Sequence, residues 1–186
     1  MNFRTLTLAA MLSVASLSGT AAFAQDNPEV GGAAMFADKN IIENAVNSAD
    51  HTTLVAAVQA AGLVETLSGE GPFTVLAPVN AAFEALPEGT VETLLKPENK
   101  EMLSTILACH VIPAKALSTD IAKMVADDGG EHKVETVGGC MLTLKAADGK
   151  VTITDENGGV ATVTIADVIQ SNGVIHVIDK VLLPKM

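Results

Sequence analysis

Apolar residues recur at helical spacing through the first half of the chain. Ile41, Ile42, Ala45 and Val46 are separated by steps that place them on one face of a helix. Gly62 predicts a helix end, because glycine adopts the left-handed conformation at little steric cost. The same pattern predicts further helices at about 54–61, 63–67, 80–86, 97–107 and 119–126.

Alternating apolar and polar positions, rich in Val, Ile and Thr, dominate the second half. The turn pairs Asp148-Gly149 and Asn157-Gly158 lie between such segments and favour hairpins. The whole pattern predicts strands at 73–77, 111–112, 134–137, 141–144, 151–154, 161–165, 174–178 and 181–183. The last two are almost wholly apolar, which predicts a central strand pair.

Helices first and strands later predict an α+β fold with an antiparallel meander. The most apolar positions of these elements predict one core that contains Phe73, Val75, Phe83, Leu107, Val163, Ile165, Ile175 and Val177.

The first 38 residues have a different character. Arg4, the short apolar segment 6–15 and the small-residue site ending at Ala24 predict a signal peptide over residues 1–24, cleaved after Ala24. The apolar segment is too short to span a bilayer, so we expect no membrane insertion after cleavage. Residues 25–38 are Pro-, Gly- and Ala-rich and predict a flexible leader before a single domain at 39–186. The expected location is the periplasm, the cell surface or the medium.

The composition narrows the classes of partner. The chain has a formal net charge of −11, and the predicted signal peptide contains Arg4 but no acidic residue. Nucleic acids and anionic lipid surfaces would repel such a protein. Tyr and Trp are absent, so platforms for stacking bases are missing as well. We therefore expect no nucleic-acid partner and attribute the acidity to solubility.

The two cysteines, Cys109 and Cys140, leave two possibilities open. An oxidising compartment favours a disulfide between them. Alternatively, both are independent buried thiols.

No known arrangement of catalytic or metal-binding residues is present in the sequence. No pair of histidines has a zinc-type helical spacing, and no phosphate-binding loop or nucleophile elbow occurs. Asp155-Glu156-Asn157-Gly158 is better interpreted as a hairpin turn than as a calcium loop. His110 and His176 lie in apolar segments, which predicts core histidines with hydrogen-bond partners, Asn80 being one candidate. We expect no cofactor, no metal and no catalytic residue.

Two sequence blocks resemble the signatures of the fasciclin (FAS1) domain family. Residues 73–83, FTVLAPVNAAF, resemble the first signature, and residues 173–184, GVIHVIDKVLLP, resemble the second. The segment around His110 lies between them, and the resemblance extends over about 40–184. The motif residues, which we expect to be structural, are Phe73, Thr74, Pro78, Asn80, Phe83, His110, His176, Asp179 and Pro184.

Two positions depart from the family pattern. Val79 replaces the usual polar residue after the proline, so a helix cap would have to come from elsewhere, for example Asn80. Cys109 replaces the tyrosine expected before His110. The resemblance implies a wedge of two mostly antiparallel β-sheets with helices packed alongside.

The resemblance also implies a function outside the cytoplasm. We expect a non-enzymatic adhesion or recognition module that binds a protein or matrix component at the cell surface. A carrier of a small apolar ligand, such as a lipid or a carotenoid, is the alternative, and a hydrolase is a remote third. The sequence does not determine the oligomeric state, and we expect a monomer.

Overall fold

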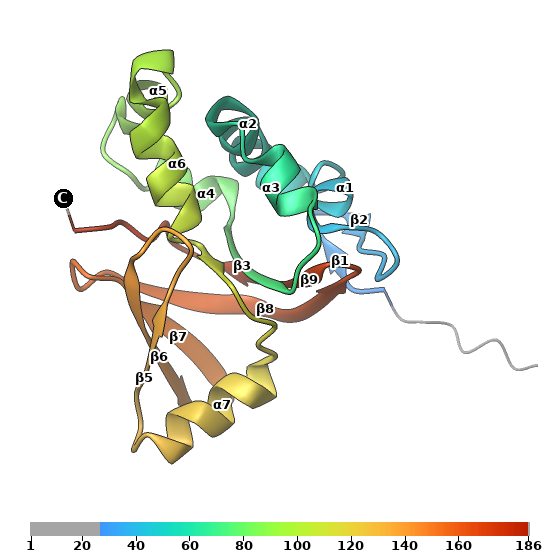
Figure 1. Cartoon of the computed structure of the whole chain (residues 1–186), viewed down its shortest axis with the longest axis vertical. Helices are drawn as coiled ribbons and strands as arrows, with labels where there is room; N and C mark the ends of the chain where they lie inside the picture. Colours follow the sequence, from blue (N-terminus) through green and yellow to red (C-terminus); the bar gives the residue numbers. More distant parts are fainter. Residues whose placement is uncertain (1–26, 186) are drawn as a thin grey trace, which may run out of the picture.

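A computed structural model describes residues 27–185 (Figure 1). The predicted signal peptide and its cleavage after Ala24 lie outside the described residues. The helices are α1 (Ile41–Ala45), α2 (Thr52–Ala61), α3 (Val64–Ser68), α4 (Asn80–Glu84), α5 (Thr90–Leu94), α6 (Lys100–Ala108) and α7 (Ser118–Asp127). The strands are β1 (Glu29–Val30), β2 (Ala33–Ala34), β3 (Phe73–Pro78), β4 (Val111–Ile112), β5 (His132–Glu135), β6 (Met141–Ala147), β7 (Lys150–Thr154), β8 (Val160–Gln170) and β9 (Gly173–Ile178).

A seven-stranded sheet with the order β4-β3-β9-β8-β7-β6-β5 forms the framework. The long strand β8 pairs with β7 near its start and with β9 further along, and its register shifts twice between Val163 and Val168. Such bulges bend a strand, so β8 divides the sheet into the two halves of a wedge. The pairing is antiparallel except between β3 and β9, which run parallel. The predicted α+β fold is confirmed.

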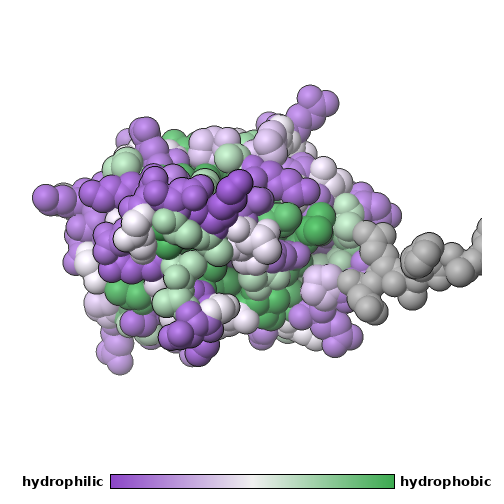
Figure 2. Space-filling view, turned by 90° about the horizontal axis from the view of Figure 1, so that it is seen from below, coloured by the Kyte–Doolittle hydropathy of each residue, from purple (hydrophilic) through white to green (hydrophobic). Residues whose placement is uncertain are grey.

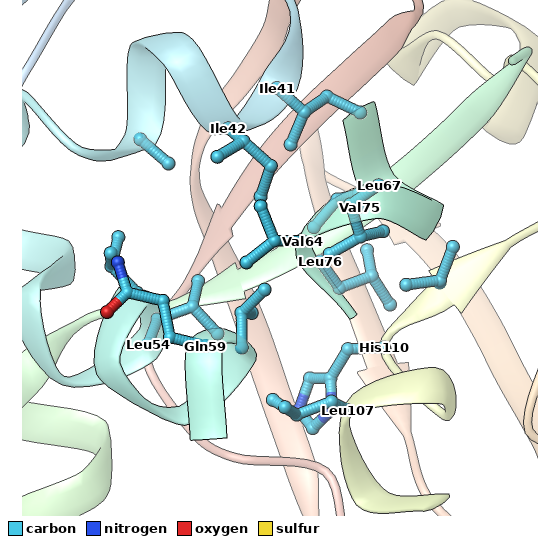
Figure 3. Close-up of a pocket in the computed structure, with 14 residues that line it drawn as sticks. Ile41, Ile42, Leu54, Gln59, Val64, Leu67, Val75, Leu76, Leu107 and His110 are labelled. Atoms are coloured by element: carbon cyan, nitrogen blue, oxygen red, sulfur yellow. The ribbon is translucent and has the colours of Figure 1, made fainter. Parts of the chain in front are cut away.

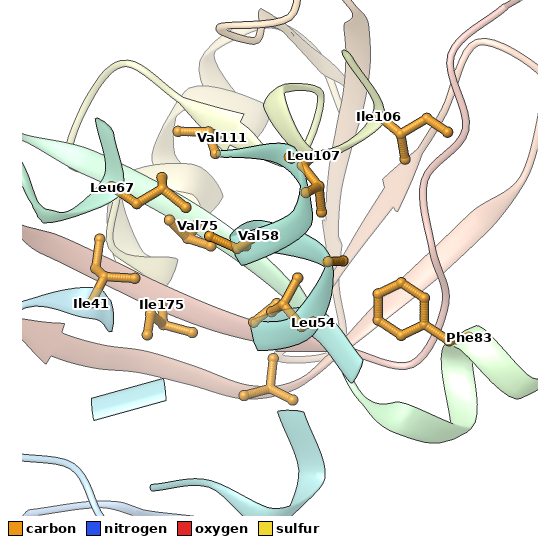
Figure 4. Close-up of a cluster of buried hydrophobic side chains, with 14 of the residues drawn as sticks. Ile41, Leu54, Val58, Leu67, Val75, Phe83, Ile106, Leu107, Val111 and Ile175 are labelled. Atoms are coloured by element: carbon orange, nitrogen blue, oxygen red, sulfur yellow. The ribbon is translucent and has the colours of Figure 1, made fainter. Parts of the chain in front are cut away.

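The helices cover the two halves of the wedge separately. Helices α1 to α6 lie on the side of β3 and β9, while α7 packs against β6 and β7 (Figure 1). One hydrophobic cluster lies beneath α1–α6 and includes Leu54, Val58 and Leu107 (Figure 4). A second cluster lies between α7 and the sheet, where Ile121 and Val125 contact the inner face. The sheet therefore separates two cores.

Five of the eight predicted core residues are buried: Val75, Phe83, Leu107, Ile175 and Val177. Phe73, Val163 and Ile165 are only half-buried and pack at the margins of the two clusters. Val163 and Ile165 flank the first register shift of β8. The bulge there interrupts the regular alternation of the strand, so the alternating pattern overestimated their burial.

The two ends of the seven-stranded sheet approach each other. The N–H of Val137 donates to the Val111 carbonyl over 2.8 Å, and the N–H of Gly138 donates to the Ala108 carbonyl over 3.1 Å. Cys109 and Cys140 form a disulfide beside these bonds, with Cα atoms 5.3 Å apart. This contact, which we call the seam, joins the end of α6 to the turn between β5 and β6.

The flexible leader predicted for residues 25–38 is wrong for its second part. Residues 29–34 form the β1–β2 hairpin, and the side chains of Val30 and Met35 are 3% and 2% exposed within the helical core. The N–H of Met35 also donates to the Pro28 carbonyl over 2.9 Å. This segment is ordered by tertiary contacts, which a local composition rich in Gly and Ala did not indicate.

Two further elements differ from the prediction. The segment 181–183 is not a strand, because the N–H groups of Leu182 and Leu183 bind side chains instead of a neighbouring strand. Helix α5 was missed because Pro87, Gly89 and Pro97 indicated only turns around it.

Candidate functional site

An apolar cavity lies between α1, α2, α3 and strand β3 (Figure 3). Its volume is about 40 Å³. Ile41 and Ile42 line it from α1, and Leu54 comes from α2. Because nearly all of the lining is aliphatic, the cavity can accept hydrocarbon but offers few groups for polar recognition.

A second cavity of about 30 Å³ adjoins the first and shares Ile41, Ala45, Leu54 and Val75 with it. His51 lines this second cavity, and one of its ring nitrogens makes no regular hydrogen bond. Its Nδ1 lies 2.9 Å from the hydroxyl of Ser48, and its buried Nε2 makes no hydrogen bond of good geometry among the described residues, although the Ala77 backbone lies near the ring. Burial lowers the pKa of His51, and the Ala77 backbone and the Asp50 charge oppose that effect.

His110 is a fully engaged core histidine. Its Nδ1 lies 2.8 Å from the Ile106 carbonyl, and its Nε2 accepts the N–H of Leu182 over 2.9 Å. These partners require a neutral ring with the proton on Nδ1. Burial lowers the pKa of His110 to about 4, although the Ile106 carbonyl and the Asp155 charge act in the other direction. The ring therefore ties the C-terminal segment to α6.

His176 has an equivalent role on β9. Its Nε2 lies 2.8 Å from the Ala116 carbonyl, and its Nδ1 accepts the N–H of Asp167 over 3.3 Å. Burial lowers the pKa of His176, with the Ala116 carbonyl and the Asp167 charge opposing. The carboxylate of Asp167 in turn binds the N–H of Ser118 over 2.6 Å and the Ser118 hydroxyl. This network fixes the start of α7 on β8 and β9.

Asn80 contacts neither of these histidines. Its Oδ1 accepts the N–H of Thr53 over 3.0 Å and the Thr52 hydroxyl over 3.2 Å, while its Nδ2 donates to the Ala49 carbonyl over 2.8 Å. The sequence suggested that this side chain caps α4. The structure shows instead that it binds the first turn of α2.

The remaining motif residues also fasten loops. Thr74 donates to the Ala114 carbonyl over 2.6 Å and accepts the N–H of Ala116 over 2.9 Å. Asp179 accepts the N–H of Thr162 over 2.7 Å. Phe73 is the first residue of β3, and Pro78 is its last and lies opposite Ile178. Phe83 packs in the helical core. The Pro184 carbonyl accepts a hydrogen bond from the Asn157 side chain over 3.0 Å. The motif residues are dispersed through the fold and form no common site.

Asp155 organises the turn that weakly resembles a calcium loop. Its carboxylate accepts the N–H groups of Asn157, Gly159 and Leu183 over 2.9, 2.7 and 3.0 Å. The carboxylate thus binds three backbone donors and joins the β7–β8 hairpin to the C-terminal segment. Within residues 27–185, no three His, Cys, Asp or Glu side chains are grouped to hold a metal ion.

The wedge of sheets and the positions of the motif residues define the class of the protein as a fasciclin domain. Residues 49–184 match the Fasciclin domain family, and the chain belongs to that family.

Similar proteins occur in bacteria and animals. Protein sll1483 of Synechocystis sp. is 53% identical over 146 residues, which cover 78% of this chain and 74% of that protein. Cell surface glycolipoprotein MPB83 of Mycobacterium bovis is 33% identical over 175 residues, which cover 89% of this chain and 70% of that protein. Transforming growth factor-beta-induced protein ig-h3 of Sus scrofa is 39% identical over 131 residues, which cover 70% of this chain but 17% of that protein.

A solved structure supports the fold. The FAS1 domain pair of the insect cell adhesion molecule Fasciclin I superposes with a TM-score of 0.70 at 18% identity, covering 78% of this chain and 51% of that one. None of the helices described within residues 27–185 is long and apolar enough to cross a membrane.

Proposed function

We propose that this protein is a non-enzymatic, exported adhesion or recognition module that binds a protein or matrix component at the cell surface. The observation that carries the proposal is its membership of the fasciclin family, together with its similarity to a cell surface glycolipoprotein over most of both chains. The polar motif residues are consistent with this proposal, because their side-chain hydrogen bonds join parts of the fold.

The outer face of β6, β7 and β8 is the surface on which we place the partner. Inward residues of these strands pack under α7, whereas Thr143, Thr154 and Val160 form a cross-strand row on the opposite face. Met141 and Val160 are 42% and 44% exposed there. Figure 2 shows the other side of the molecule, where α7 lies, with hydrophilic residues around smaller hydrophobic areas. An uncovered sheet face with exposed apolar side chains offers area for a protein contact.

A binding experiment with surface variants tests this proposal. The mature protein would be immobilised and exposed to envelope or matrix preparations, and each captured component would be purified and titrated back. We expect saturable binding that Met141→Lys or Val160→Lys weakens. Met102→Lys is the matched control, because Met102 is 45% exposed but lies on α6. Absence of saturable binding to every purified component would refute the adhesion proposal, and equal loss in all three variants would refute the chosen face.

The two adjoining cavities favour a carrier of a small apolar ligand as the second candidate. Their lining is aliphatic, and the unpartnered Nε2 of His51 could bind a polar end group. However, volumes of about 40 and 30 Å³ are far below the ~300–1,000 Å³ of typical ligand pockets. A lipid or carotenoid would therefore require α1 and α2 to separate, which is why we rank this function second.

Native protein purified without detergent distinguishes the carrier from the adhesion module. An absorbance spectrum and mass spectrometry of an organic extract would reveal a stoichiometric carotenoid or lipid. Ala45→Phe would fill the shared part of the two cavities, and a carrier should then lose its ligand while the partner-binding titration is unchanged. An extract without ligand would exclude the carrier.

A further inference from the structure

Strand β5 is an edge of the sheet that is open over residues 132–135, whereas Val137, the next outward residue, is already bonded to Val111 across the seam. It is the last strand in the order and pairs only with β6 among the described strands. Sheet edges expose backbone donors and acceptors, and they are therefore potential sites of pairing with another chain. Lys133 and Glu135 are exposed and project from the same face of this strand, because side chains alternate along it.

The backbone groups of Lys133 and Glu135 point away from β6. The N–H of Thr136 donates to the Cys140 carbonyl over 3.0 Å and therefore points toward β6. Successive residues of a strand direct their N–H and C=O groups to opposite sides. The next residue, Val137, accordingly points outward and donates to Val111 across the seam. By the same alternation, Lys133 and Glu135 present their backbone N–H and C=O groups at the free edge.

We propose that β5 is a self-association surface, on which a second copy of this chain pairs its own β5 in antiparallel orientation around Val134. The two-fold axis would pass through Val134 of both copies. Lys133 would then lie opposite the partner's Glu135, and Glu135 opposite the partner's Lys133. In this register the outward backbone groups of each opposed pair bond to each other, as in an ordinary antiparallel ladder.

The charges of β5 select this register. A two-fold axis perpendicular to the sheet places the outer faces of both copies on the same side. Other registers must keep this arrangement, so they place the axis at a different residue of β5. An axis at Lys133 would oppose the two lysines, and an axis at Glu135 would oppose the two glutamates. Opposite charges directly across a ladder stabilise it, whereas like charges destabilise it. Glu131, two residues before Lys133, is paired with Lys145 over 2.6 Å and is also within the electrostatic influence of Lys133.

The association is weak, because β5 is a strand of four residues and its charge pairs are exposed. It therefore depends on protein concentration and salt. This surface adjoins the outer face assigned to the adhesion partner, because Glu135 lies directly opposite Met141 on β6. The two proposals are tested by different measurements, self-association of the protein alone and binding of a captured component, so either proposal can fail without the other.

Sedimentation velocity of the mature protein over a concentration series tests the inference. We expect reversible dimerisation that weakens as salt is added. Lys133→Glu or Glu135→Lys places like charges opposite each other and should raise the dimer Kd at least ~10-fold, equivalent to about 1.4 kcal/mol. The double variant Lys133→Glu/Glu135→Lys restores opposite charges and should return the Kd to within about 3-fold of the original protein.

Lys150→Glu is the matched control, because Lys150 is exposed at the start of β7 and remote from the proposed contact. It changes the net charge as Lys133→Glu does and should leave the Kd unchanged. Circular dichroism melts would verify that every variant is folded. The inference is overturned if the original protein stays monomeric at all concentrations, if a single reversal leaves the Kd unchanged, or if the double variant does not recover dimerisation. Equal weakening by Lys150→Glu also overturns it, because net charge would then be the cause.

Discussion

His110 couples protonation to folding at the level of one side chain. Both ring nitrogens bind backbone groups that require the neutral ring, and burial lowers the pKa to about 4. An unfolded chain would take up the proton near the ordinary histidine pKa of ~6.5. The unfolded state therefore binds more protons between these values, and protonation in that interval favours unfolding.

We expect the contribution of His110 to be complete above pH 6.5 and to decline as the pH falls toward about 4. The loss is about 3 kcal/mol for this residue alone. Urea melts at pH 7.0 and 4.5 would measure it, with His110→Gln as the reference because glutamine does not titrate there. The stability advantage of the original protein over the variant should shrink at the lower pH. A constant difference would contradict a lowered pKa.

Phe83 provides a second test at the residue scale. Its side chain is 8% exposed in the helical core, so Phe83→Ala would remove apolar contacts and leave a cavity. We expect a loss of about 3–5 kcal/mol in unfolding free energy. Phe36→Ala is the matched control, because Phe36 is 39% exposed and should cost much less. Similar urea midpoints for both variants would refute the burial of Phe83.

At the scale of the element, Asn80 determines where α2 begins. Helix α2 has no side-chain cap of its own, and the amide of Asn80 supplies the bonds to its first turn from the neighbouring helix. The position thus acts as a cap from outside the helix, which explains why local sequence rules assigned it to α4.

Replacing Asn80 should loosen α2 selectively. We expect Asn80→Ala to lower the free energy of unfolding by about 1–2 kcal/mol. The variant loses the oxygen that accepts the Thr53 N–H and the amide that donates to the Ala49 carbonyl. Hydrogen exchange would show faster exchange at Thr53, whose N–H binds the side chain. Asn80→Asp retains the acceptor but not the donor to Ala49, so its effect should be intermediate. Unchanged exchange at Thr53 in Asn80→Ala would exclude this role.

The sequence predicted the helices and strands better than it predicted the long-range contacts that they make. Long periodic segments such as α2, α6 and β9 were located within a few residues, because their own pattern is strong. The β1–β2 hairpin was missed because Val30 and Met35 are buried by distant parts of the chain. Leu182 appeared to belong to a strand because of its apolar neighbours, but its N–H binds His110 far earlier in the sequence.

At the scale of the whole molecule, the disulfide secures the seam between the two ends of the sheet. The sequence left the pairing of Cys109 and Cys140 open, because spacing alone does not establish proximity. It also gave no indication that the turn at Gly138 lies against α6. A Cβ on Gly138 would come within 2.8 Å of the Cys109 nitrogen, so this close approach requires glycine.

We expect the Cys109→Ser/Cys140→Ser variant to lose about 3–4 kcal/mol, because the bridge closes a loop with a sequence separation of 31 residues. Chemical melts under non-reducing conditions would measure the difference. Titration of the unfolded original protein should detect no free thiol. Two free thiols per chain would show that the folded protein lacks the bridge.

The position of β9 has a consequence for the order of folding. This strand lies in the interior of the sheet between β3 and β8, yet its residues 173–178 follow every other described strand in the sequence. Strand β3 pairs with β4 on one side, but its partner on the other side lies about a hundred positions later, and contacts between such distant segments slow folding. Six of the seven strands of the sheet therefore precede the strand that joins β3 to β8. The two halves of the wedge can be connected through β9 only when residues 173–178 are available, so the complete sheet forms late in folding.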